Sequence, residues 1–226
     1  MAQAIAETIF DICYLSFAVI TGLIMLTKGT TPLVKKAGMM TALLGAGDSF
    51  HLIPRSYALW TTGLEANKAA LGFGKFVTSI TMTVFYLILY YIWRDRYQIR
   101  GQKNLTAAMW SLSALRIGLC LLPQNRWLQY RQPLFYGILR NIPFAVMGAV
   151  VILIFAREAK RADDRIFRYI PLAVGLSFGF YLPVVLFSGL FPVIGMLMIP
   201  KTMAYVWIVL MNWKLYRQPL SLAETL

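Results

Sequence analysis

The sequence predicts an all-α protein, a single domain (residues 1–226) built as a seven-helix transmembrane bundle. Three observations lead to this fold class. Of the 226 residues, 59% are hydrophobic and 14% are charged, whereas soluble domains carry about 25% charged residues. Seven apolar stretches reach or approach the length of about 20 residues that crosses a bilayer. The connections between these stretches are too short to hold a separate soluble domain.

Each helix is bounded by the charged residues and prolines that flank its apolar run. The first run contains Glu7 and Asp11 near its start and lacks a basic leader, which argues against a cleaved signal peptide. Pro123 is expected to close the fourth helix, Pro133 to open the fifth and Pro192 to open the seventh. The expected helices are 6–27, 36–54, 70–93, 105–122, 134–156, 169–187 and 192–213. Kinks or breaks are expected at Pro143, Pro171, Pro183 and Pro200.

The basic residues predict how the bundle is oriented. Fourteen Lys and Arg residues fall in the connections on one side, whereas the other side has only Arg55, Lys68, Arg126 and Arg131. By the positive-inside rule, the N-terminus lies outside and the C-terminus lies in the cytoplasm. We therefore expect an integral protein of a bacterial plasma membrane. The net charge of +13 is interpreted as topology and attraction to anionic membrane lipid, not as nucleic-acid binding.

Ionisable residues interrupt the apolar stretches at similar depth. A charge inside a membrane segment costs roughly 2.5–3.5 kcal/mol on insertion scales, so each is a candidate functional residue. At about 1.5 Å per residue, most of them lie about 8–12 Å below the outer surface, and Lys201 lies near the midplane. The interrupting residues are Asp11, Asp48, His51, Lys75, Arg116, Arg140 and Lys201.

Helical spacing directs these residues toward the bundle interior, because lipid cannot hydrogen-bond polar groups. Tyr136 precedes Arg140 by one turn, and Tyr205 follows Lys201 by one turn. Four cations among these residues face two firm carboxylates, which predicts a polar pocket that accepts an anion or an anionic lipid. The candidate binding residues are Asp11, Lys75, Arg116, Arg140, Lys201, Tyr136 and Tyr205. The alternative is that the charges form structural pairs with one another.

The densest local motif is in residues 45–55, where glycines, including Gly47, precede Asp48, and Leu52 and Pro54 follow it. This segment resembles the YhhN-type lysoplasmalogenases, small polytopic enzymes that hydrolyse the vinyl-ether bond of lysoplasmalogens. The resemblance implies that Asp48 is the general acid, that His51 orients water and that the basic residues hold the lipid phosphate. It implies no metal or organic cofactor. The sequence departs from the family in having no acid in 134–156, 169–187 or 192–213 and no histidine in 70–93.

Other functions fit the same residues. A transporter or a non-catalytic receptor for a small anion or a lysophospholipid would need the same cationic pocket without chemistry. A retinal-binding protein would use Lys201 in the seventh helix, although 70–93 lacks a carboxylate to act as counter-ion. The two cysteines, Cys13 and Cys120, lack metal-ligand spacing. The sequence leaves their pairing, the oligomeric state and the substrate open.

Overall fold

The structure, a computed structural model, describes residues 2–129, 132–188 and 190–218. Arg131, one of the four basic residues counted on the outer side, lies outside these ranges. The described residues are mainly helical and confirm the all-α class. The α-helices are α1 (Ala2–Lys28), α2 (Pro32–Trp60), α3 (Lys68–Arg96), α4 (Lys103–Leu121), α5 (Leu134–Arg161), α6 (Ile170–Phe187) and α7 (Met198–Tyr216). Three short 3-10 helices join them: η1 (Pro123–Asn125), η2 (Phe167–Tyr169) and η3 (Pro192–Leu197).

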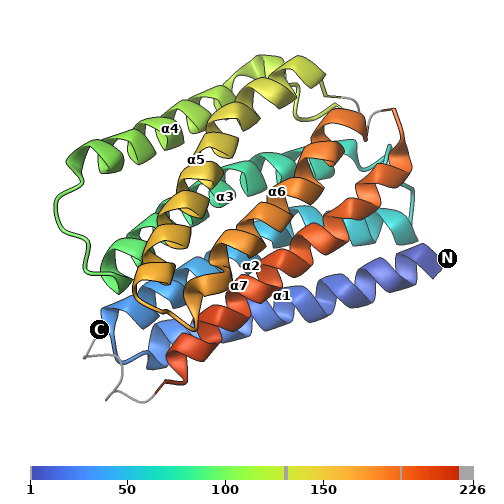
Figure 1. The fold of residues 1–226 in the computed structure, drawn as a ribbon. Helices are drawn as coiled ribbons and strands as arrows, with labels where there is room; N and C mark the ends of the chain where they lie inside the picture. The colour runs from blue at the N-terminus through green and yellow to red at the C-terminus, as the bar shows by residue number, and fades with distance from the viewer. Residues whose placement is uncertain (1, 130–131, 189, 219–226) are drawn as a thin grey trace.

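Successive helices run in opposite directions, so the start of α1 and the end of α7 lie at opposite ends of the bundle (Figure 1). We call these the N end and the C end. The N end holds the start of α1 and the α2–α3, α4–α5 and α6–α7 connections, and the C end holds the remaining connections and the end of α7. Each helix packs on its neighbours in sequence, and α7 closes the bundle against α1 and α2.

Helix α3 forms the centre of the core and also contacts α5. Its large side chains Phe85, Tyr86 and Tyr90 are fully buried. Tyr86 stands edge-on to Phe144 of α5, with ring centroids 4.9 Å apart. These contacts fill the space between the two halves of the bundle with aromatic rings, which prefer edge-to-face packing.

Helices α1 and α2 approach each other most closely because glycines line their interface. A Cβ atom at Gly22 would overlap the backbone nitrogen of Ala42, and one at Gly38 would overlap the backbone of Leu26. Small residues allow such backbone contact between membrane helices. This contact fixes the position of Asp48, which lies later on α2.

Helix α2 is longer than the sequence predicted, because Pro54 does not end it. A proline removes one intrahelical hydrogen bond, here the one to the Phe50 carbonyl, and this carbonyl is where Gly74 of α3 comes closest. The helix continues to Trp60, whose indole N–H donates to Thr8 Oγ1 at 2.9 Å. The last two turns are therefore held by α1 and α3.

Two of the four prolines expected to interrupt helices lie in first helical turns instead. Pro143 and Pro183 lie inside α5 and α6, and both helices continue through them without a break. Pro171 instead lies in the first turn of α6, where its missing N–H costs no hydrogen bond. Pro200 likewise falls in the first turn of α7, which begins at Met198 after η3 and not at Pro192.

Six of the described helices, all except α2, are long and apolar enough to cross a membrane. Large apolar side chains cover their outer surface, including Ile9 and Ile12 on α1, Phe135 and Leu153 on α5 and Leu115 on α4. An outward-facing apolar surface is typical of a bundle in lipid. Helix α2 carries more polar residues and packs between α1 and α3. The architecture is that of an integral membrane protein.

Candidate functional site

Asp48 lies at the centre of a group of polar side chains inside the bundle. The Tyr14 hydroxyl of α1 donates to Asp48 Oδ2 at 2.7 Å, and both residues are buried. Lys201 of α7 is also buried and lies within electrostatic range of Asp48, although no ion pair within 4.0 Å joins them in the described part of the chain. Three helices thus place a carboxylate, a phenol and an amine together.

Aromatic rings and hydroxyl groups surround the Lys201 amine. Its Nζ lies 5.1 Å from the Tyr205 ring centroid and 5.5 Å from that of Tyr181, distances suited to cation–π attraction. The Tyr205 hydroxyl faces the side chains of Ser177 and Tyr86. The positive charge of Lys201 is therefore stabilised partly by these ring faces and partly by Asp48.

Arg116 of α4 lies on the other side of this group and is 2% exposed. Its guanidinium carbon is 3.4 Å from the Phe144 ring centroid. Its Nε and Nη1 atoms are buried without hydrogen-bond partners among the described residues, and no described carboxylate forms an ion pair with it. Its polar neighbours are the Cys120 thiol and three phenols, of which Tyr181 donates to Asn141 Oδ1 at 3.1 Å. An unneutralised buried cation is costly.

We call this group the interior polar cluster. It combines four residues from the predicted site, Asp48, Arg116, Lys201 and Tyr205, with side chains that were not among the predicted site residues. The cluster consists of Tyr14, Asp48, Tyr86, Arg116, Asn141, Ser177, Tyr181, Lys201 and Tyr205.

The other predicted residues lie nearer the N end and outside the cluster. Asp11 is buried and accepts a hydrogen bond from Ser56 at 3.0 Å. Arg140 is half-buried, donates to Asn125 Oδ1 at 2.8 Å and stacks over Trp127 at 4.2 Å. Lys75 is exposed on the surface of α3, and Tyr136 contacts the Phe135 ring. The predicted excess of two interior cations is therefore reduced to one, carried by Arg116.

His51 is separated from Asp48 although the two are one turn apart on α2. Asp48 is held by Tyr14, whereas His51 faces the backbone of Leu71 on α3. The Nδ1 atom of His51 is buried without a hydrogen-bond partner in the described structure. The arrangement places the Asp48 carboxyl group against Tyr14 and does not hydrogen-bond the two predicted catalytic residues to each other.

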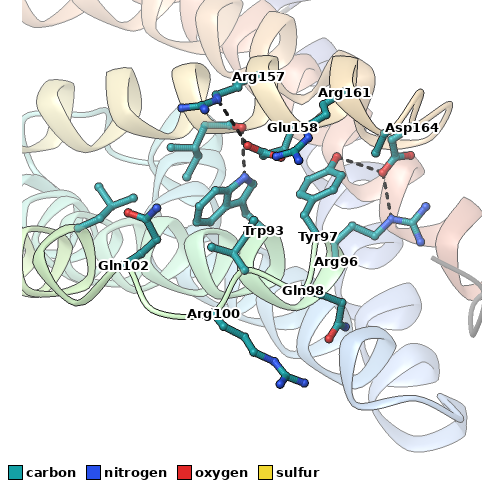
Figure 2. Close-up of a pocket in the computed structure, with 14 residues that line it drawn as sticks. Trp93, Arg96, Tyr97, Gln98, Arg100, Gln102, Arg157, Glu158, Arg161 and Asp164 are labelled. Carbon is teal, nitrogen blue, oxygen red and sulfur yellow. Dashed lines mark hydrogen bonds and ion pairs between the residues drawn. The ribbon is translucent and has the colours of Figure 1, made fainter.

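A cleft of about 650 Å³ opens at the C end and has no lining residue in common with the interior polar cluster (Figure 2). We call it the C-end cleft. Arg157, Glu158 and Arg161 of α5 line one wall, and the α3–α4 connection lines the other (Figure 2). Trp93 lies between the walls and donates through its indole N–H to the Ile154 carbonyl at 3.1 Å.

A buried ion pair closes one side of the C-end cleft. Arg96 Nε lies 2.9 Å from Asp164 Oδ2, and the two side chains are 6% and 2% exposed. Burial alone would raise the pKa of Asp164, but the hydrogen bond and charge of Arg96, with the backbone N–H groups of Ile166 and Phe167, outweigh burial and lower it. Burial raises the pKa of the Tyr97 phenol, and the charge of the same carboxylate, which accepts a hydrogen bond from Tyr97, raises it further.

Sequence reasoning missed several members of the cluster. Ser177 and Tyr181 lie four residues apart on the otherwise apolar α6, and this spacing is the signal that would have revealed them. Cys13 and Cys120 are free. Among the described residues, no three His, Cys, Asp or Glu side chains gather in a way that suits a metal ion. Comparisons with protein families, with curated proteins and with solved structures find no match to this chain.

Proposed function

We propose that this chain is a seven-span membrane protein whose interior polar cluster binds the anionic group of a lipid-like molecule. The N-terminus lies outside and the C-terminus in the cytoplasm of a bacterial plasma membrane. The basic connections at the C end support this orientation, because positive loops are retained inside. Helix α2 is the seventh span, and its polar face is shielded by α1 and α3.

The observation that carries the proposal is the buried, unpaired guanidinium of Arg116. Asp48 and Lys201 offset each other's charge, whereas no described carboxylate offsets Arg116. A phosphate or carboxylate placed against Arg116 would supply the missing acceptors, since arginine binds such groups through two parallel hydrogen bonds. The phenols of Tyr181 and Tyr205 lie within electrostatic range of the same guanidinium.

The surroundings favour an amphiphile over a free inorganic anion. Phe144, Phe178 and Tyr86 form the wall beside Arg116, and their rings pack with centroids 4.9–5.8 Å apart. Apolar rings of this kind contact an acyl or alkyl chain while the polar tips contact its head group. A single-chain lysophospholipid combines both features.

Hydrolysis of a vinyl ether is the enzymatic form of this proposal. Asp48 would protonate the alkene carbon, and water would attack the resulting oxocarbenium ion. Tyr14 would hold the carboxyl group in place. His51 would act only after a rearrangement, because its side chain faces Leu71 and not Asp48.

Purified protein incubated with vinyl-ether and ester-linked lysophospholipids tests the proposal. Binding that weakens in Arg116→Met supports the anion site. Formation of aldehyde from the vinyl ether, lost in Asp48→Asn, makes the protein a hydrolase, whereas binding without product makes it a receptor or transporter. Failure of both lipids to bind would refute the proposal.

A retinal-binding protein is the second candidate, and one observation favours it. Asp48 on α2 supplies a carboxylate beside the Lys201 amine, the position of a Schiff-base counter-ion. Retinal added to the purified protein would then produce a visible absorbance band that disappears in Lys201→Met. The absence of a band would exclude this candidate and leave the first intact.

A further inference from the structure

The C-end cleft has more positive charge than its own residues neutralise. Arg96 is fully occupied by Asp164, since both side chains are buried together. Arg157 and Arg161 share the single carboxylate of Glu158, at 3.7 and 3.8 Å. Arg100, on the opposite wall, forms no ion pair with a described residue. The cleft therefore carries an excess of two positive charges.

Arg157 and Arg161 are presented together by α5. Residues four apart lie on the same helical face, and both guanidinium groups project beside Glu158 along the upper wall in Figure 2. Their side chains are 81% and 78% exposed, so neither group is committed to the protein interior. Two exposed arginines that share one carboxylate on one helical face suit the several oxygen atoms of a phosphate group.

The cleft also has an apolar part. Trp93, Leu105 and Ile154 line it beside the arginines. Arginines alone would form only a charged surface of the kind that positive connections create at any cytoplasmic boundary. The combination of an apolar floor with charged walls suits a molecule that carries both a phosphate and a short apolar portion.

The backbone around the C-end cleft is held in an uncommon conformation. Gln98 and Gln102 on one wall have φ angles of 49° and 51°, and Asp163 beside the other wall has a φ of 45°. Residues other than glycine seldom adopt these left-handed values, and they concentrate at functional sites. Three of the four such residues in the described chain thus border this cleft.

We propose that the C-end cleft is a binding site for a phosphate ester, held by Arg157 and Arg161 of α5. The ester is the head group of an anionic phospholipid or a soluble phosphate compound. The site is distinct from the interior polar cluster and does not depend on the function proposed for it, because no residue of the cluster lines the cleft.

A charge-matched pair of variants tests the site. Arg157→Gln/Arg161→Gln removes two charges from the cleft. Lys160→Gln/Arg165→Gln removes two exposed charges from the same end of the bundle, and neither residue lines the cleft. The full-length protein in detergent micelles receives phosphatidylglycerol or phosphatidylcholine, with bound lipid counted by native mass spectrometry. In a second arm, glycerol 3-phosphate is added and its binding is measured by calorimetry.

The proposal predicts that the cleft variant binds the phosphate ligand about tenfold or more weakly, while the control variant binds like the wild type. Preference for phosphatidylglycerol over phosphatidylcholine with no binding of glycerol 3-phosphate identifies a lipid head group, and binding of glycerol 3-phosphate identifies a soluble ligand. Equal weakening in both variants would reduce the effect to general surface charge and overturn the proposal. Unchanged binding in the cleft variant, or no binding in either arm, would also overturn it.

Discussion

Replacing Arg116 by methionine should stabilise the ligand-free protein. Arg116 is 2% exposed and lacks an ion-pair partner among the described residues. An arginine at the centre of a membrane helix costs roughly 2.5–3.5 kcal/mol. Its contact with the Phe144 ring, at 3.4 Å, offsets roughly 2 kcal/mol of this when desolvated. The free energy of unfolding should therefore rise by about 1 kcal/mol in the variant.

Arg96→Met is the matched control, because Arg96 is also a buried arginine but is paired. Its Nε contacts Asp164 Oδ2 at 2.9 Å. Removing one member of a buried pair leaves the other charge without compensation and costs roughly 3–5 kcal/mol. The two substitutions change the same side chain to the same residue and are expected to have opposite signs.

Unfolding of delipidated protein in mixed micelles, followed by tryptophan fluorescence against denaturant concentration, measures both effects. Lipid must be removed first, because a bound anion would stabilise the wild type by mass action. A loss of roughly 3 kcal/mol or more in Arg116→Met, similar to that in Arg96→Met, would show that the folded chain neutralises Arg116. That result would refute the reasoning.

Three further predictions concern acid stability, helix packing and topology. Because folding lowers the pKa of Asp164, the stability that its charged form contributes is complete above about pH 4 and is lost as the pH falls below that value. The difference in unfolding free energy between wild type and Asp164→Asn should therefore shrink on acidification. A constant difference from neutral pH to pH 3 would contradict this. Gly22→Val should lower the free energy of unfolding by roughly 1–3 kcal/mol, because the added atoms meet the Ala42 backbone at the α1–α2 contact. The control is Gly118→Ala on α4, where the space around the glycine is open; its unfolding midpoint should be unchanged or raised. In a chain without its native cysteines, a membrane-impermeant thiol reagent applied to intact cells should label Ala66→Cys and spare Ala162→Cys, both at exposed positions; the reverse pattern would invert the proposed topology.

The sequence predicted the helices well because apolar length and flanking charge determine them locally. It failed at Pro54, where contacts from α1 and α3 hold the turns beyond the proline. It failed also at the start of α7, where the chain first forms η3. Both errors depend on neighbours that are distant in sequence.

The candidate site was predicted in part for a similar reason. The depth of a residue in the membrane follows from counting residues along its helix, so Asp48, Arg116 and Lys201 were correctly identified as interior candidates. Direction around the helix axis depends on how the helices pack, so Lys75 was placed inside although it is exposed. Arg140 is bound by Asn125 and Gln132 of the connection before α5, and no periodic pattern describes that connection.

The C-end cleft could not be predicted, because its walls depend on irregular backbone. Its connections turn at Gln98, Gln102 and Asp163 in left-handed conformations that usually indicate glycine. The sequence gives Gly101 as the only glycine among residues 97–102. The basic residues were recognised there as a topology signal, but their convergence on one cleft required the structure.

The most direct test of the central claim is the dissociation constant of a single-chain phospholipid for the wild type, Arg116→Met and Arg140→Met. Loss of a charged hydrogen-bonding group should weaken binding about tenfold or more in Arg116→Met. Binding should be nearly unchanged in Arg140→Met, since Asn125 and Gln132 already bind that guanidinium. Equal affinity in wild type and Arg116→Met would contradict the claim that the buried arginine holds an anionic ligand.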